Sequence, residues 1–140
     1  MEKYIHYGSE RFDPEKFMPV CNFMVKPLGG LWASRIDDKY GWYGWCHGKE
    51  FRLNTFKKHF EFSLANSAKV LFLDDPKQLR KLPKIDMRHS LWKETFLDFE
   101  ELAKKYDAVE VTDIGSLYRA LYGWDCNSII VMNPNVIIPV

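Results

Sequence analysis

Three short clusters in the sequence place a polar or aromatic side chain beside a glycine or a turn. They are residues 5–9 (Ile-His-Tyr-Gly-Ser), residues 29–34 with the aromatic run 40–45 close behind, and residues 124–128 (Trp-Asp-Cys-Asn-Ser). Glycine lets a ligand approach the backbone closely, and a Trp or Tyr beside it offers a flat face to a planar ring. A neutral His6 can hydrogen-bond a ribose hydroxyl. The pattern indicates a site for a flat, ring-bearing nucleotide.

Taken singly, each cluster has a plainer interpretation. A lone histidine such as His6 is typical of a hydrogen-bonded core or edge residue. The Trp-rich run 40–45 is equally typical of core packing. What favours a site is the order in which the clusters follow one another along the chain.

That order resembles the ADP-ribosyltransferase fold, in the His-Tyr-Glu branch that includes poly-ADP-ribose polymerases and diphtheria-toxin-like enzymes. The family's first strand carries His-Gly-Ser/Thr, and residues 6–9 here read His-Tyr-Gly-Ser, with one residue inserted. The family's Gly-Ile-Tyr-Phe-Ala-like strand is similar to residues 30–34, with Trp32 in place of the tyrosine. A helix rich in small and aromatic residues follows in both, here around residues 40–46. Residues 26–34 and 122–126 also resemble small bacterial and phage proteins.

The sequence departs from the family at the catalytic glutamate, which comes just before a strand of the Ile-Val-Tyr type. Asn127 stands there instead, with Asp125 two residues earlier, and Glu110 is a further candidate. In the family the glutamate bonds the nicotinamide-side ribose and stabilises an oxocarbenium-like transition state. A neutral amide keeps the hydrogen bond but not the charge, which is worth roughly 10² to 10³ in rate.

The resemblance implies that NAD is the substrate and assigns roles to individual residues. His6 would hold the ribose, Gly8 and Ser9 the carboxamide, and Trp32 would cover the nicotinamide. Asp125 would orient the acceptor or supply the missing charge, with Asn127 in the place of the glutamate. The full set of expected NAD-binding residues is His6, Tyr7, Gly8, Ser9, Gly30, Trp32, Ser34 and Tyr40.

Three functions stay open at this point. The first is an NAD-dependent mono-ADP-ribosyltransferase that acts on a protein or nucleic-acid acceptor. The second is a catalytically degenerate module of the same fold that binds NAD, another nucleotide or a partner, which Asn127 favours. The third is an RNA 2′-phosphotransferase of related fold, for which the basic candidates are His6, Arg35, His59 and Arg119.

Composition predicts one soluble, cytoplasmic domain spanning residues 1–140, large enough to bury a core without disulfides. The net charge is +1, lower than is usual for a protein that coats duplex nucleic acid. The three cysteines have no metal-ligand spacing, and Cys46-His47 lacks a second ligand pair, so we expect free thiols and no metal. No signal peptide or membrane-spanning run is expected.

Hydropathy patterning predicts an α+β domain. The resemblance refines this to a split core of two small antiparallel sheets with flanking helices. We expect the chain to form strands over residues 3–7, 31–34, 56–64, 68–73, 108–111, 128–132 and 136–140. Residues 68–73 should be a central strand, and the last two strands could pair through the turn 133–135. Expected helices run from Asp37 or Asp38 through Cys46, and over 76–82, 91–106 and 116–122, with a loop over 12–27.

A basic stretch runs from Lys77 to Arg88 with one acidic residue, Asp86, inside it. A solvated helical face is the plain interpretation. A grip on a phosphate backbone is the sharper one and slightly favours a phosphate-bearing acceptor. Because no aromatic residues interleave with these charges, the stretch is not typical of a single-strand binding groove.

Overall fold

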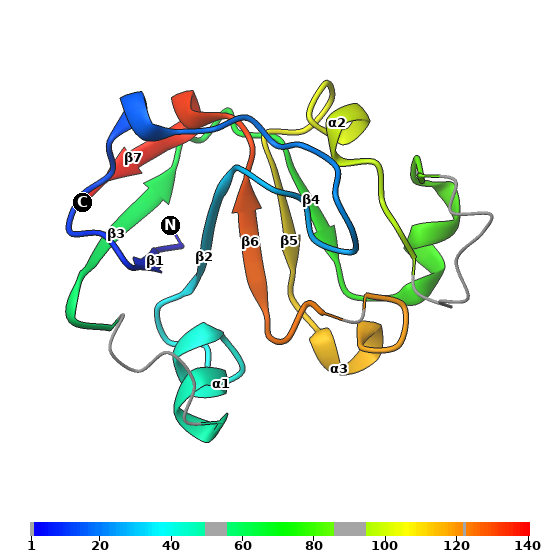
Figure 1. Cartoon of the computed structure of the whole chain (residues 1–140), viewed down its shortest axis with the longest axis horizontal. Helices are drawn as coiled ribbons and strands as arrows, with labels where there is room; N and C mark the ends of the chain where they lie inside the picture. The colour runs from blue at the N-terminus through cyan, green and yellow to red at the C-terminus, as the bar shows by residue number, and fades with distance from the viewer. Residues whose placement is uncertain (1, 50–55, 86–94, 122) are drawn as a thin grey trace.

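The computed structural model describes residues 2–49, 56–85, 95–121 and 123–140. It is a mixed α+β structure with one seven-stranded sheet and few helices (Figure 1). The strands are β1 (Tyr4–Tyr7), β2 (Leu31–Arg35), β3 (His59–Leu64), β4 (Val70–Leu73), β5 (Ala108–Val111), β6 (Ser128–Val131) and β7 (Ile137–Pro139). The helices are α1 (Trp42–Lys49), α2 (Phe99–Leu102) and α3 (Ile114–Leu117), with 3-10 turns η1 (Pro14–Lys16), η3 (Pro76–Lys81) and η4 (Pro134–Val136).

The strand order across the sheet is β4-β5-β6-β2-β1-β3-β7. Among the described strands, β4 and β5 pair in parallel and the other neighbours pair antiparallel. The α+β class is therefore confirmed, with one parallel pair that the sequence did not predict. None of the helices in the described part of the chain is long and apolar enough to cross a membrane.

The two central strands, β1 and β2, separate along their length. Their ladder pairs Tyr4 with Arg35 and Ile5 with Ser34, and no further pair follows in register. Beyond that point β1 continues along β3 as far as Tyr7, while β2 continues along β6 to Leu31. In Figure 1 the half with β1, β3 and β7 accordingly diverges from the half with β2, β6, β5 and β4. The N-terminal end of β2 and the C-terminal end of β1 border this divergence.

Two buried clusters pack on opposite faces of the sheet. One holds Val109, Val111 and Ile130 against α2, α3 and the residues of the 17–30 loop. The other joins Tyr4 and Phe62 on one half to Ala108 and Ile129 on the other. On this second face the Tyr4 hydroxyl reaches the Glu110 carboxylate at 2.8 Å, although three strand spacings, about 14 Å in a flat sheet, separate their strands. The sheet is therefore concave on this face.

Several local predictions are confirmed. Residues 12–27 form a loop with a single 3-10 turn, and a helix is present where one was predicted through Cys46. This helix, α1, begins only at Trp42, whose N–H donates to the Ser34 hydroxyl, and Asp38 accepts from the Tyr40 N–H in the preceding turn instead of capping it. Asp75 caps the turn that starts at Pro76, and Gln78 completes a capping box by bonding back to the cap residue. Asp113 likewise caps α3, so a helix is present near the predicted range 116–122, but it begins two residues earlier and ends at Leu117.

Three predictions are wrong. Residues 95–98 and 103–106 of the expected helix 91–106 lie outside α2. Residues 95–98 are extended because the apolar Leu97 pairs with Lys84 in an isolated bridge and packs in the buried cluster. Residues 91–94, and Tyr122 at the end of the expected helix 116–122, lie outside the described residues. Strand β4 lies at the edge of the sheet with Phe72 49% exposed, so it is not central. The last two strands do not pair, since β6 lies between β5 and β2 while β7 adds to β3.

Candidate functional site

His6 lies where β1 and β2 separate, and its side chain replaces the missing backbone pairing. Its Nδ1 is 2.6 Å from the backbone oxygen of Trp32. A carbonyl oxygen only accepts, so Nδ1 carries the proton and Nε2 is left with a lone pair. A Cβ built on Gly8 would stand 4.0 Å from Nε2, which places this acceptor beside the glycine. His6 thus joins the two strand ends that carry the first two sequence clusters.

The imidazole of His6 is neutral at physiological pH. Burial lowers its pKa from the ordinary value of 6.5, and the bond to the Trp32 carbonyl offsets this only in part. A neutral ring with a free Nε2 accepts a hydrogen bond from a hydroxyl donor.

An apolar cavity of about 670 Å³ lies on one side of His6, which we call the tryptophan cavity. Indole rings from three parts of the chain line it, namely Trp32, Trp42 and Trp124, the last two of which the sequence interpretation did not assign. The rings of Trp32 and Trp124 meet edge to face with centroids 4.8 Å apart, so the wall is pre-assembled. A cavity of this size and lining suits a planar aromatic ligand.

Asp125 is the carboxylate in the lining of the tryptophan cavity. It forms an ion pair with Lys26 at 3.7 Å, and its side chain is 34% exposed. The Lys26 ammonium also lies 5.9 Å from the centre of the Trp32 ring. A cation therefore already sits between an indole face and a carboxylate, at a place where a positively charged ring would find the same two partners.

A second cavity of about 700 Å³ lies on the other side of His6, which we call the glycine cavity. Gly8, Ser9 and Gly30 line it together with His6 and Trp32. The N–H of Gly8 donates to the oxygen of Lys58 at 2.8 Å, and that of Gly30 donates to Met18 at 2.7 Å. These two N–H groups therefore serve the fold, and Ser9, which is exposed, is left to bond a ligand.

Gly30 also has a packing role that no other residue can fill. Its φ is +68°, and a Cβ there would stand 2.7 Å from a side-chain carbon of Ile130. Both the left-handed backbone and the close approach to β6 exclude a larger residue. Gly30, directly before β2, therefore allows β2 to pack closely against β6.

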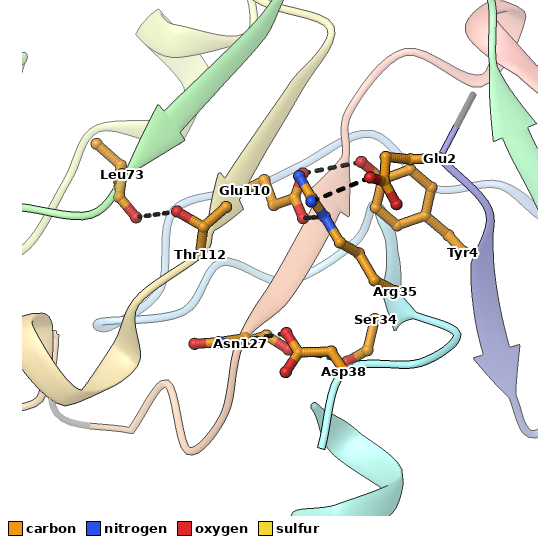
Figure 2. Close-up of polar contacts among 9 residues, drawn as sticks. All are labelled: Glu2, Tyr4, Ser34, Arg35, Asp38, Leu73, Glu110, Thr112 and Asn127. Carbon is orange, nitrogen blue, oxygen red and sulfur yellow. Dashed lines mark hydrogen bonds and ion pairs between the residues drawn. The ribbon is translucent and has the colours of Figure 1, made fainter. Parts of the chain in front are cut away.

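Asn127 cross-links three elements and lines neither cavity. Figure 2 shows it beside Ser34 and Asp38. Its Oδ1 accepts from the Ile114 N–H at 2.8 Å, and its Nδ2 donates to Asp38 at 3.0 Å. Its backbone oxygen accepts from the Ser34 hydroxyl at 2.9 Å, and its N–H donates to Tyr40 at 2.9 Å. With all four polar groups in use, Asn127 fixes the turn after β2 to the start of α3.

Glu110, the other expected carboxylate, is also occupied. It is 3% exposed and accepts from the Tyr4 hydroxyl and from the Arg35 guanidinium, with Nε at 2.7 Å (Figure 2). Burial together with the charge and hydrogen bond of Glu110 raises the pKa of Tyr4. The hydrogen bond with Glu110 likewise raises the pKa of Arg35. This ion pair holds the concave face together, away from both cavities.

The structure thus divides the expected site residues into three groups. Asp125 and Tyr7 line the tryptophan cavity; Gly8, Ser9 and Gly30 line the glycine cavity; and His6 and Trp32 line both. Ser34, Tyr40 and Asn127 line neither and form the cross-link just described. The residues missed by sequence reasoning are Lys26, Trp42 and Trp124, for which the only signal was a Trp within an aromatic cluster or a lysine before Pro27.

No group of three or more metal-ligating side chains occurs within the described residues. Cys46 and Cys126 are buried and Cys21 is exposed, all as free thiols. Burial raises the pKa of Cys126 to about 12, so this thiol beside Asp125 stays protonated and is not a nucleophile at neutral pH.

The buried His6 predicts a pH dependence of stability. As the pH falls below 6.5, the unfolded chain takes up a proton at this residue before the folded one does, because the folded pKa is the lower. The stabilisation is complete above 6.5 and is lost down to the folded pKa, with a slope of at most about 1.4 kcal/mol per pH unit. Urea unfolding between pH 7.5 and 5.5 measures it. His6→Gln should flatten this part of the profile, and an unchanged profile would contradict the assignment.

No protein-family model matches this chain, and the comparisons with curated proteins and with solved structures likewise found no match.

Proposed function

We propose that the chain is an NAD-dependent mono-ADP-ribosyltransferase-like protein that binds the dinucleotide where β1 and β2 separate. The observation that carries this proposal is the position of His6. It bridges the separated strands through the Trp32 carbonyl and presents a free Nε2 between two adjoining cavities. The strand divergence at this point supports the split core that the family resemblance implies.

The two cavities suit the two ends of the ligand differently. The tryptophan cavity offers indole faces and the Asp125 carboxylate, which suit a positively charged pyridinium ring. The glycine cavity offers Ser9 and more cationic than acidic side chains, namely Arg11, Lys16 and Lys58 against Glu10 and Asp13, which suits hydroxyls and phosphates. Nε2 of His6 lies at their junction and would accept from the ribose between them.

In the transfer that we propose, the bond between the nicotinamide nitrogen and the ribose carbon breaks. Its electron pair goes to the ring nitrogen, and nicotinamide leaves as a neutral molecule. The ribose carbon then bonds to an oxygen or nitrogen of the acceptor, which loses a proton to solvent or to a carboxylate. Asp125 stabilises the positive charge that develops on the ribose, which takes the place of Lys26 beside this carboxylate.

A second candidate is a module of the same fold that binds NAD, another nucleotide or a partner without turnover. The commitment of Asn127 and of Glu110 to the fold favours it, because neither side chain is placed to act on a ribose in the cavities. Where this module binds NAD, it differs from the first candidate in lacking turnover.

The test is NAD binding by calorimetry together with nicotinamide release followed by NMR. We expect wild-type protein to bind NAD, and both His6→Ala and His6→Gln to weaken binding at least about tenfold, the worth of a buried hydrogen bond to a polar ligand. Tyr40→Ala is the matched control, since this expected NAD-binding residue is 62% exposed and lies outside both cavities.

Each outcome separates the candidates. Release that depends on His6 supports the transferase, and saturable binding without release supports the binding module. No binding of NAD by a folded wild-type protein overturns the transferase and the NAD-binding form of the module. Equal losses in His6→Gln and Tyr40→Ala would contradict the cavity assignment.

A further inference from the structure

A second surface, beside the cavities, combines positive charge with exposed aromatic rings. Residues 39–60 contain five Lys or Arg and one Glu, a net charge of +4, whereas the whole chain carries +1. The rest of the chain is therefore at −3. Within the described residues of this segment, Lys49, Lys57 and Lys58 are all exposed. Positive charge is thus concentrated in one segment of a chain whose other residues carry a net negative charge.

The aromatic rings on this surface come from three segments and form one assembly, which we call the aromatic surface. Tyr43 and His47 of α1 stack with centroids 3.9 Å apart, and both are exposed. Phe56 packs edge-on against Tyr43 at 5.2 Å and lies 4.4 Å from Tyr7 of β1. The ring of His59, at the start of β3, lies 5.9 Å from that of Tyr7. These mutual contacts fix the rings before any ligand arrives.

The aromatic surface is continuous with both cavities. Tyr7 belongs to it and also lines the tryptophan cavity, and Lys58 lines the glycine cavity. The other basic stretch, at Lys77 and Lys81 of η3, lies next to β4, at the opposite edge of the sheet from β1 and β3 (Figure 1). A phosphate-bearing partner that must reach the cavities is therefore served by residues 43–49 and 56–59 and not by the stretch that the sequence singled out.

We propose that the aromatic surface binds single-stranded nucleic acid. Bases of the strand stack on the exposed rings of Tyr43 and His47. The phosphates of the strand lie along Lys49, Lys57 and Lys58. Stacking on aromatic rings beside a positive groove is the general mode by which proteins hold single strands. Such a strand would pass the mouth of the tryptophan cavity at Tyr7. Its role as the ADP-ribose acceptor rests on the proposed function, whereas its binding to this surface does not.

The first experiment measures binding without NAD, by fluorescence anisotropy of labelled 12-mers of single-stranded DNA and RNA with the same sequence. Tyr43→Ala should weaken binding about 5- to 150-fold, the worth of one stacked base, and Tyr43→Phe should restore it because the ring is kept. Tyr118→Ala, at a residue 53% exposed against 52% for Tyr43, is the matched control and should leave binding unchanged.

The charges are tested by the salt dependence. Lys57→Gln/Lys58→Gln should lower the slope of log K against log salt by about 1.4, for two phosphates on a single strand. Lys77→Gln/Lys81→Gln removes the same charge at the far edge of the sheet and should leave the slope unchanged. Tighter binding of one of the two 12-mers identifies the sugar that is preferred.

Failure of this inference is distinguishable from failure of the proposed function. The inference is overturned if wild-type protein binds neither 12-mer at about 50 mM salt. It is also overturned if the two pairs of lysine substitutions change the salt slope equally. With NAD labelled in the ADP-ribose part, transfer of label to the bound 12-mer supports the acceptor role. Nicotinamide release without transfer overturns that role, and binding of the 12-mer without any NAD cleavage overturns only the proposed transferase.

Discussion

Arg35→Met should lower the free energy of unfolding by about 3 kcal/mol, the lower end of the range for removing one partner of a buried ion pair. Glu110 is the reason, because its side chain is only 4% exposed and depends on Arg35 for its counter-charge. The lower end applies because the Arg35 side chain is itself 33% exposed. Against a typical total of 5–15 kcal/mol, this is a large loss. Urea unfolding at pH 7 measures it.

Two further variants show whether charge burial is the cause. Glu110→Gln keeps an acceptor for the Tyr4 hydroxyl and removes the buried charge, so it should cost less than Arg35→Met. The combined change Tyr4→Phe, Arg35→Met and Glu110→Leu replaces the whole network by apolar groups and should recover most of the stability. A loss below about 1 kcal/mol in Arg35→Met, the range of surface ion pairs, would show that Glu110 is solvated instead.

This network also shows what the sequence could and could not predict. Alternating and continuous apolar runs place most strands correctly, because burial on one or both faces has a local signature. The partner of Glu110 has no such signature, since Tyr4 and Arg35 are 106 and 75 residues away in sequence. Only the curvature of the sheet brings them together. A carboxylate in the middle of an apolar strand suggested a catalytic candidate, and the fold uses it as a structural one.

The wrong bounds of the helix expected over residues 91–106 also have a long-range cause. Trp92, Phe96, Phe99 and Leu102 recur at helical spacing, and Phe96, Phe99 and Leu102 are indeed buried. The chain buries residues 96 and 97 in an extended segment and starts α2 only at Phe99, after Asp98, which caps the helix by accepting from the Glu101 N–H. Asn22, from the distant loop, accepts from the Phe99 N–H at 2.8 Å and reinforces this start. The spacing of apolar residues therefore predicts which side chains are buried. Where the helix begins is decided here by long-range hydrogen bonds.

For the candidate site, the order of the motifs along the chain predicted their proximity better than the individual residues predicted their roles. The motifs around His6 and Trp32 are brought to one place, because β1 and β2 are neighbours whose ladder stops at Ile5 and Ser34. The motif before β6 is brought near as well, but the side chain that reaches a cavity is Asp125 and not Asn127. The conformation of the turn before β6 decides whether Asp125 or Asn127 points into a cavity. The local sequence does not determine that conformation.

Asp125→Asn should lower the rate of nicotinamide release from bound NAD about 10²- to 10³-fold, and should also weaken NAD binding, because the carboxylate attracts the cationic ring. The expectation follows from the proposed transferase and from the occupied state of Glu110 and Asn127. Asp125 is then the carboxylate left to stabilise positive charge on the ribose. Because Asn is isosteric and the side chain is 34% exposed, folding should be preserved. Single-turnover release followed by NMR, with affinity from calorimetry, separates the two effects.

Lys26→Met provides the opposite change at the same place. The ammonium lies 3.7 Å from Asp125 and 5.9 Å from the Trp32 ring centre, so it competes with a cationic ring for both. Removing it should tighten the binding of NAD, whose nicotinamide is charged, and leave that of NADH, whose ring is neutral, nearly unchanged. If Asp125→Asn turns over within threefold of wild type, the carboxylate does not act on the ribose. If Lys26→Met then still discriminates NAD from NADH, the cavity binds the cationic ring without catalysing its release, which is the behaviour of the binding module.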